Sequence, residues 1–227
     1  RRSREIFEAF GDEVGIIQSE QVLFNIARQR GDLDEARRII HGLVSLQEKR
    51  GYRWGLASAV NGLGDIARTE AKLDKAEAHY RRAASLFESV SHSSSQARSI
   101  GIKLALVLIA QERYEEAESL LADVKIVVDK TGSALARGFA RLLLSCCAAG
   151  QANWAAFDTP FLKGLSLLSQ ADVHHVDVAV TAERIGRLAL RKGQGDRAYR
   201  ALLLAQRQWG GLGRKAEETR VGALLDQ

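Results

Sequence analysis

A six-residue phrase recurs along this chain of 227 residues at a spacing of about forty. The copies are GDLDEA at 31–36, AKLDKA at 71–76, ERYEEA at 112–117 and GQGDRA at 193–198, with a weaker copy, GQANWA, at 150–155. Each copy ends in an alanine, and these are Ala36, Ala76, Ala117, Ala155 and Ala198. A repeat of this length is typical of stacked helical hairpins, because a single hairpin cannot bury its own apolar face. The repeat therefore predicts an architecture and says little about function.

Apolar and small residues flank each copy at helical spacing. Around Ala76, for example, Leu63, Gly64 and Ala67 precede the phrase and Tyr80 follows it. Small residues at a helix crossing let two backbones approach, while large ones fill the space between neighbouring hairpins. Aromatic residues make up only 6% of the chain, which disfavours a strand-rich core. Each unit is predicted to be a helix, a tight turn and a second helix.

The segment NGLGDIARTEAKLDKAEAHYRRAASLF, residues 61–87, resembles the tetratricopeptide repeat (TPR) family in its longer form of bacterial signalling proteins. The family's positions are occupied by Gly64, Ala67, Ala76, Tyr80 and Ala83. The resemblance covers nearly the whole chain, although the family's early tryptophan and helix-ending proline are missing. It implies an all-α fold, a right-handed α-α superhelix of about five helical hairpins with a terminal capping helix.

On this basis we expect a single TPR-like solenoid over 1–227. Residues 1–11 are interpreted as the end of a truncated preceding repeat, and 213–227 as the capping helix. The repeats are expected at about 14–50, 53–90, 94–130, 133–171 and 174–212. Pro160 is the only proline and follows Asp158 and Thr159, a pattern typical of a helix start, so a break or shifted start is expected there.

In a solenoid of this family the concave surface is formed by first-helix positions that packing does not use. These positions hold Asn25, Arg28, Asn61, Asp65, Arg68, Lys103, Arg141, Glu183, Arg184, Arg187 and Arg191. Seven of them are basic and two are acidic. We therefore predict a groove that binds an acidic or carboxylate-bearing segment of a protein or peptide partner through charge-assisted hydrogen bonds. The alternative is a solvated face whose charges pair along the helices.

Certain relatives hold a chain-terminal carboxylate with a clamp of two lysines and two asparagines. Asn25 and Lys103 lie at matching positions here, but Gln21 replaces the first lysine and Gly62 the second asparagine. The clamp is incomplete, and that ligand is not predicted. The net charge of +5 is spread along a sequence of mixed sign, whereas a nucleic-acid-binding protein gathers its basic residues into a stripe.

The sequence contains no constellation that predicts catalysis, a cofactor or a metal site. It has no phosphate-binding loop, dinucleotide fingerprint or nucleophile elbow. His174 and His175 are adjacent and are expected to diverge, with Asp172 as a helix cap. Cys146 and Cys147 are expected to be reduced thiols in the core of a cytoplasmic protein.

Two classes of function remain open. The first is a non-catalytic interaction and regulatory module of a larger bacterial signalling protein, whose partner can be an upstream domain of the same polypeptide. The second is a sensor that closes around a small molecule or peptide to control an attached kinase, ATPase or transcription-regulator domain. The resemblance of 175–214 to the closing repeats of large bacterial serine/threonine kinases or signalling ATPases implies that any catalysis belongs to such a neighbouring domain. The longest apolar run, 104–110, is too short to span a bilayer.

Overall fold

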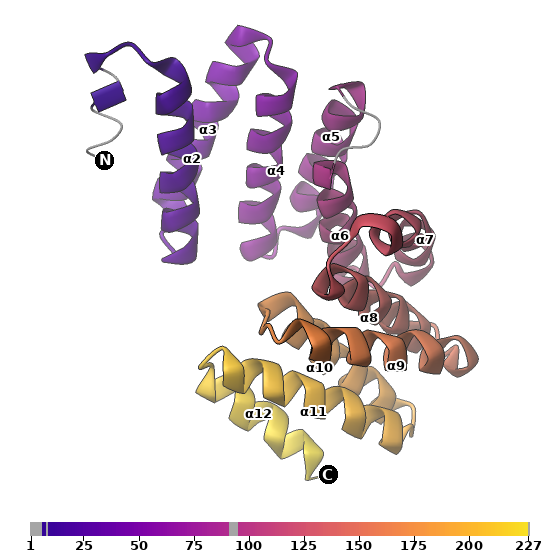
Figure 1. Ribbon diagram of the computed structural model, residues 1–227. Helices are drawn as coiled ribbons and strands as arrows, with labels where there is room; N and C mark the ends of the chain where they lie inside the picture. Colours follow the sequence, from indigo (N-terminus) through magenta and orange to yellow (C-terminus); the bar gives the residue numbers. More distant parts are fainter. Residues whose placement is uncertain (1–5, 8, 91–94, 227) are drawn as a thin grey trace. The chain divides into compact units, whose positions relative to one another are not determined.

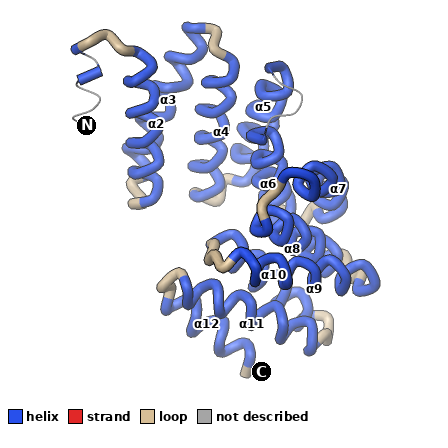
Figure 2. Tube along the Cα trace, viewed as in Figure 1, coloured by secondary structure: helices blue, strands red, loops and turns tan. Residues whose placement is uncertain are grey.

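The computed structural model of the chain describes residues 6–7, 9–90 and 95–226 (Figure 1). Every regular element within these ranges is helical, with no strand, which confirms the predicted all-α class (Figure 2). The longer helices are α2 Glu13–Gln29, α3 Leu33–Arg50, α4 Arg53–Thr69, α5 Leu73–Val90, α6 Ser95–Ala110, α7 Tyr114–Thr131, α8 Ala134–Gly150, α9 Trp154–Ala171, α10 Val176–Arg191, α11 Gly195–Gly211 and α12 Lys215–Leu225. The predicted end of a preceding repeat, at 1–11, lies largely outside the described residues.

The chain divides into two compact units, residues 1–107 and 108–227, with the division inside α6. In the first unit α2 packs against α3, α3 against α4, and α4 against α5. In the second unit α8 pairs with α9 and α10 with α11, and the two first helices, α8 and α10, also pack against each other. Each unit is thus built from antiparallel hairpins whose neighbours share a core.

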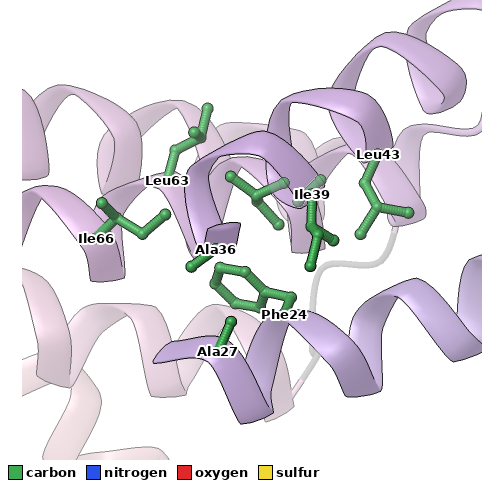
Figure 3. Packing of buried hydrophobic residues seen from close by; sticks show 9 residues of the cluster. Phe24, Ala27, Ala36, Ile39, Leu43, Leu63 and Ile66 are labelled. Atoms are coloured by element: carbon green, nitrogen blue, oxygen red, sulfur yellow. The ribbon is translucent and has the colours of Figure 1, made fainter. Parts of the chain in front are cut away.

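The core of the first unit shows how three consecutive helices share one apolar cluster (Figure 3). The cluster includes Phe24 and Ala27 from α2, Ala36, Ile39, Ile40 and Leu43 from α3, and Ala59, Leu63 and Ile66 from α4. Ala36, which closes the first copy of the phrase, has no exposed surface. The repeated alanine is therefore a packing position, because a larger side chain would separate the two helices of a hairpin.

Glycines allow the closest approaches within hairpins. A Cβ atom placed on Gly64 of α4 would lie 2.5 Å from Cε1 of Tyr80 on α5, so the tyrosine ring packs directly on the glycine backbone. Gly186 of α10 has the same relation to Leu202 of α11, where the added Cβ would lie 2.5 Å from Cγ. The small residues of the phrase's upstream flank thus mark the places where two helices touch.

The turn inside each hairpin has the same backbone geometry in every copy. Its residue of positive φ is, in order, Gly31 at 77°, Ala71 at 56°, Glu112 at 61°, Ala152 at 56° and Gly193 at 66°. In each case the next amide donates to a carbonyl five residues earlier, and the amide of the positive-φ residue donates three residues back, as in Schellman caps. Three of the five turns hold this conformation without glycine, at a steric cost of about 1–2 kcal/mol each.

This geometry corrects the fourth copy of the phrase. The buried alanine lies five residues after the positive-φ residue in the other copies, for example Ala36 after Gly31. In the fourth hairpin the same count from Ala152 leads to Phe157, which has no exposed surface, whereas the expected Ala155 is exposed. The alignment to Ala155 was therefore wrong by two residues.

The expected break at Pro160 is also wrong, because α9 continues through this residue from Trp154 to Ala171. Proline removes one helical hydrogen bond, which normally costs about 3 kcal/mol in a helix interior. Phe157 and Phe161 lie on either side of it, are buried, and stack with their ring centroids 4.9 Å apart. We attribute the continuous helix to burial of these two rings, which requires helical geometry on both sides of the proline.

No helix in the described ranges combines the length and the apolar character needed to cross a lipid bilayer.

Candidate functional site

In the first unit, three of the predicted groove residues form an internal network. Lys103 of α6 donates from Nζ to Asp65 of α4 at 2.7 Å and to Asn61 Oδ1 at 3.1 Å. Tyr80 donates from its hydroxyl to Asp65 at 2.8 Å, and burial together with the Asp65 charge raises the pKa of this phenol far above its ordinary value. These contacts hold the lysine charge against a carboxylate of the same unit.

The other predicted residues of this unit are Asn25, Arg28 and Arg68. Asn25 is exposed on α2, while Arg28 and Arg68 are half-buried. A clamp that needs a free lysine cannot use Lys103, because Asp65 neutralises it. The first unit therefore fits the alternative in which charges pair between helices better than it fits an open basic surface.

In the second unit, Arg141 of α8 is likewise occupied. Its side chain is 15% exposed, forms an ion pair of 2.7 Å with Asp129 of α7, and donates to the carbonyl of Arg137 at 3.1 Å. The hydrogen bond from Arg141 lowers the pKa of the Asp129 carboxyl. Arg141 thus fastens α8 to α7 and is a poor candidate for partner binding.

Glu183 of α10 is the centre of a second network. Its side chain is only 10% exposed, and one carboxylate oxygen accepts from Nη2 of Arg187 at 2.8 Å. The other oxygen accepts from Nη2 of Arg220 at 2.8 Å and from Nε1 of Trp209 at 3.3 Å. Burial alone would raise the pKa of Glu183, but the hydrogen bonds from the two arginines outweigh burial and lower it. Glu183 is thus ionised and fully paired at neutral pH.

A cavity of about 590 Å³ opens beside this network, between α10 and α12. We call it the arginine pocket, and its lining residues are Val180, Glu183, Arg184, Arg187, Leu190, Arg191, Arg220 and Leu224. It contains Arg184, Arg187 and Arg191, the three predicted arginines of α10. The structure therefore brings one part of the predicted residue set together, around a single acid.

The arginines of this pocket differ in how they are held. Arg184 approaches Glu112 at 3.4 Å, and its Nε is buried without an acceptor among the described residues. Arg191 is exposed, and no side chain in the described part of the chain forms an ion pair with it. Arg187 is committed to Glu183. Arg184 and Arg191 are therefore the cations with the most capacity left for a ligand.

Arg220 is the functional candidate that the sequence analysis missed. It is 37 residues from Glu183 in the sequence, on the helix interpreted only as a cap. The two side chains meet because α12 packs against α11 and brings its Arg220 to α10. The composition of α12 offers no signal for this contact, since its two basic residues, Lys215 and Arg220, are balanced by Glu217 and Glu218.

The histidine pair lies at the connection between α9 and α10. His175, not Asp172, caps α10, because its Nδ1 accepts from the amide of Asp177 at 3.1 Å. Asp172 instead ends α9 with a φ of 46°, in the left-handed region. Asp172 is therefore a helix cap, as predicted, but at the C-terminal end of α9 and not at the start of α10. Across the described residues, no three His, Cys, Asp or Glu side chains gather in a way that could hold a metal ion.

Cys146 and Cys147 are both buried on α8 and are not joined in a disulfide, as the sequence predicted. Burial raises the pKa of Cys146 to about 12 and raises the pKa of Cys147 as well. Thiols of this kind are unreactive, because the thiolate is the nucleophilic form.

No protein-family model matches this sequence, and no curated protein matches it. Solved structures do resemble the fold. BtubC (BKLC) from P. vanneervenii has a TM-score of 0.69 at 17% identity, covering 93% of this chain and 89% of that one. A putative kinesin light chain of Podosopora anserina with TPR-like repeats has a TM-score of 0.63 at 15% identity, covering 87% and 97%. PilW, a type IV pilus biogenesis factor, has a TM-score of 0.60 at 17% identity, covering 92% of each chain. The chain therefore has the helical-repeat fold of TPR-like proteins.

Proposed function

We propose that this chain is a non-catalytic interaction module of a larger bacterial signalling protein, and that its arginine pocket binds an acidic segment of a protein partner. The observation that carries the proposal is the charge of the pocket. Four arginines line it against one carboxylate, Glu183, which Arg187 and Arg220 already neutralise. The remaining positive charge favours a ligand that brings its own carboxylates.

The apolar part of the lining defines the ligand further. Val180, Leu190 and Leu224 contribute side chains to the same pocket, so a ligand gains by placing an apolar group beside its carboxylates. A peptide in which acidic and apolar residues alternate meets both requirements. It presents carboxylates to Arg184 and Arg191 and an aliphatic side chain to the leucines.

The fold supports a binding role, because the exposed helices of stacked hairpins present a broad surface. The solved structures of similar fold include kinesin light chain TPR-like repeats. A fold by itself carries no function, and the proposal therefore depends on the pocket. We place the module in the cytoplasm, attached to a kinase or ATPase domain, and the partner segment in that domain or in a separate protein.

A second candidate is a sensor of small carboxylates. The volume of the arginine pocket, about 590 Å³, lies in the range of about 300–1,000 Å³ that small-molecule sites occupy. In that case free dicarboxylates would raise the melting temperature without any peptide, and the rise would continue with the logarithm of their concentration above the dissociation constant.

The test is fluorescence anisotropy with a labelled eight-residue peptide of alternating glutamate and leucine, compared with its lysine and leucine counterpart. The wild-type chain should bind the glutamate peptide at least tenfold more tightly, and increasing salt should weaken binding because the charges are partly exposed. The variant Arg184→Glu/Arg191→Glu should lose this preference. It leaves Arg187 and Arg220 in place, so the Glu183 network is retained.

The matched control is Lys130→Glu/Lys163→Glu, which makes the same charge change at exposed positions of α7 and α9 outside the pocket. It should leave affinity for the short peptide within about twofold of wild type. Equal affinity of the wild-type chain for both peptides would contradict the proposal, as would unchanged binding in the Arg184/Arg191 variant. Stabilisation by free dicarboxylates without peptide binding would favour the sensor.

A further inference from the structure

A second recess of the same unit lies outside the arginine pocket, between α9 and α11. It has a volume of about 540 Å³, and the connection Asp172–His174 is part of its lining. Its apolar lining comes from Leu165, Leu168, Leu203 and Leu204, with Val173 at the connection. We call this the leucine groove. Leu165, Leu203 and Leu204 are half-buried and Val173 is 44% exposed, so apolar surface remains open to a partner.

The two rims of the leucine groove differ in charge. Along α11 the rim consists of Arg200 and Arg207, which are exposed, and along α9 it consists of Ser166 and Ser169. Asp172 is the one carboxylate of the lining. The groove is therefore apolar along its floor and basic along one side only.

The positive charges of the two rim arginines are available to a charged partner. The neighbouring carboxylate, Asp158, forms its ion pair with Arg197 at 2.7 Å, and that hydrogen bond lowers the pKa of Asp158. Neither Arg200 nor Arg207 forms an ion pair with any residue that the structure describes. Arg200 lies near enough to Asp158 to contribute to lowering the pKa of that carboxyl. An incoming carboxylate would therefore share Arg200 with Asp158, and it would meet no ion-pair partner of Arg207 among the described residues.

The spacing of the arginines identifies the shape of the partner. Arg200 and Arg207 are seven residues apart, two turns of α11, or roughly 10.5 Å along its axis. Leu203 and Leu204 lie between them and line the floor. A helix laid alongside α11 has the same period, so acidic residues seven apart on one flank would meet both arginines while apolar residues between them enter the groove.

We propose that the leucine groove is a docking site for an amphipathic α-helix of a protein partner, with a leucine-type apolar face and Asp or Glu on the flank beside α11. The groove itself is held in shape by the α9–α10 connection. The amide of His175 donates to Oε1 of Gln208 at 2.8 Å, and the ring of His174 packs on Gly211, where an added Cβ would lie 2.2 Å from it. The site is thus formed before a partner arrives, and it binds independently of the arginine pocket.

The test uses two labelled peptides of about 14 residues, a length at which an isolated helix is marginal in water. Both carry leucine at helical spacing, and one has glutamate and the other lysine at positions seven apart on one flank. The wild-type chain should bind the glutamate peptide at least tenfold more tightly by anisotropy, and the peptide's helical circular dichroism should increase on binding. The Arg200→Glu/Arg207→Glu variant should invert the preference and favour the lysine peptide, and Leu204→Asp should lose both.

The matched control is Lys130→Glu/Lys163→Glu, which makes the same charge change at exposed positions outside both sites and should bind the glutamate helix as wild type does. Arg184→Glu/Arg191→Glu is measured beside it to show how much of the binding the arginine pocket takes. If the charge reversal impairs folding, as judged by thermal unfolding, Arg200→Gln/Arg207→Gln replaces it and should abolish the discrimination. Equal affinity for the two peptides would overturn the proposal, and so would binding lost only in the Arg184/Arg191 variant. Self-association abolished by Leu204→Asp would assign the groove to a second copy of the chain instead.

Discussion

Arg220 donates a hydrogen bond to the carboxylate of Glu183 at 2.8 Å, so an ion pair with a buried acid fastens the last helix to α10. Arg187 and Trp209 complete the set of donors to this carboxylate. The network gives α12 a role in shaping the arginine pocket, because Arg187 and Arg220 both line that pocket. Stability and binding are therefore coupled at this site.

We expect Glu183→Gln to lower the free energy of unfolding by about 1–3 kcal/mol, since an amide cannot neutralise the two guanidinium groups. The pKa of Glu183 is lower in the folded chain than its ordinary value of 4.5, so its ionisation stabilises the fold above that pH. This stability is lost as the pH falls through the folded-state pKa. Urea unfolding of both proteins should therefore differ most near pH 7, and the difference should shrink as the pH falls below 4.5 and through the folded-state pKa. A constant difference at every pH would contradict this account.

Gly64→Ala should destabilise the first unit by about 1–3 kcal/mol, because the new Cβ would lie 2.5 Å from the Tyr80 ring in a packed core. Gly42→Ala is the matched control. Gly42 lies on the exposed face of α3 and an added Cβ would meet nothing within 4 Å, so this change should stabilise by up to about 1 kcal/mol through helix propensity. Denaturant unfolding of the two variants should give opposite signs, and equal effects would argue against the close approach.

The period of the phrase was sufficient to predict the helical fold, because Ala36, Ala76 and Ala117 each occupy a fully buried position. The prediction failed at Ala155, because it aligned the fourth copy by residue identity and not by its position in the turn. The backbone instead places Ala152 in the left-handed region, although Gly150 and Asn153, the residue types of this segment that favour this conformation, lie within two residues of it.

The candidate site was harder to predict for a different reason. The positions of Lys103 and Arg141 were identified, but their charges are neutralised by Asp65 and Asp129, which lie on other helices. Ion pairs between helices depend on which side chains the packing brings within reach, and a list of exposed positions does not contain that information. The contribution of Arg220 escaped notice for the same reason.

The left-handed turn residues lead to a prediction of opposite effects at equivalent positions. Ala71→Gly should stabilise the chain by about 1 kcal/mol, because glycine adopts the φ of 56° without the clash of a Cβ atom. Gly31→Ala, at the same place in the preceding hairpin with a φ of 77°, should destabilise by a similar amount. Thermal unfolding of both variants provides the measurement. A loss of stability in both would indicate that side-chain contacts of Ala71 outweigh the backbone term.

The two cysteines allow a test of burial in the second unit that does not depend on stability. Burial raises the pKa of Cys146 to about 12, so almost none of the reactive thiolate is present at pH 8, and the side chain has no exposed surface. Cys147 is buried beside it. A thiol reagent such as a colorimetric disulfide should therefore detect no reactive thiol in the native chain over several minutes and both thiols in guanidinium chloride. Labelling of the native chain at the same rate as the unfolded chain would mean that α8 is open to solvent. The packing of the second unit, which forms both proposed binding sites, would then be wrong.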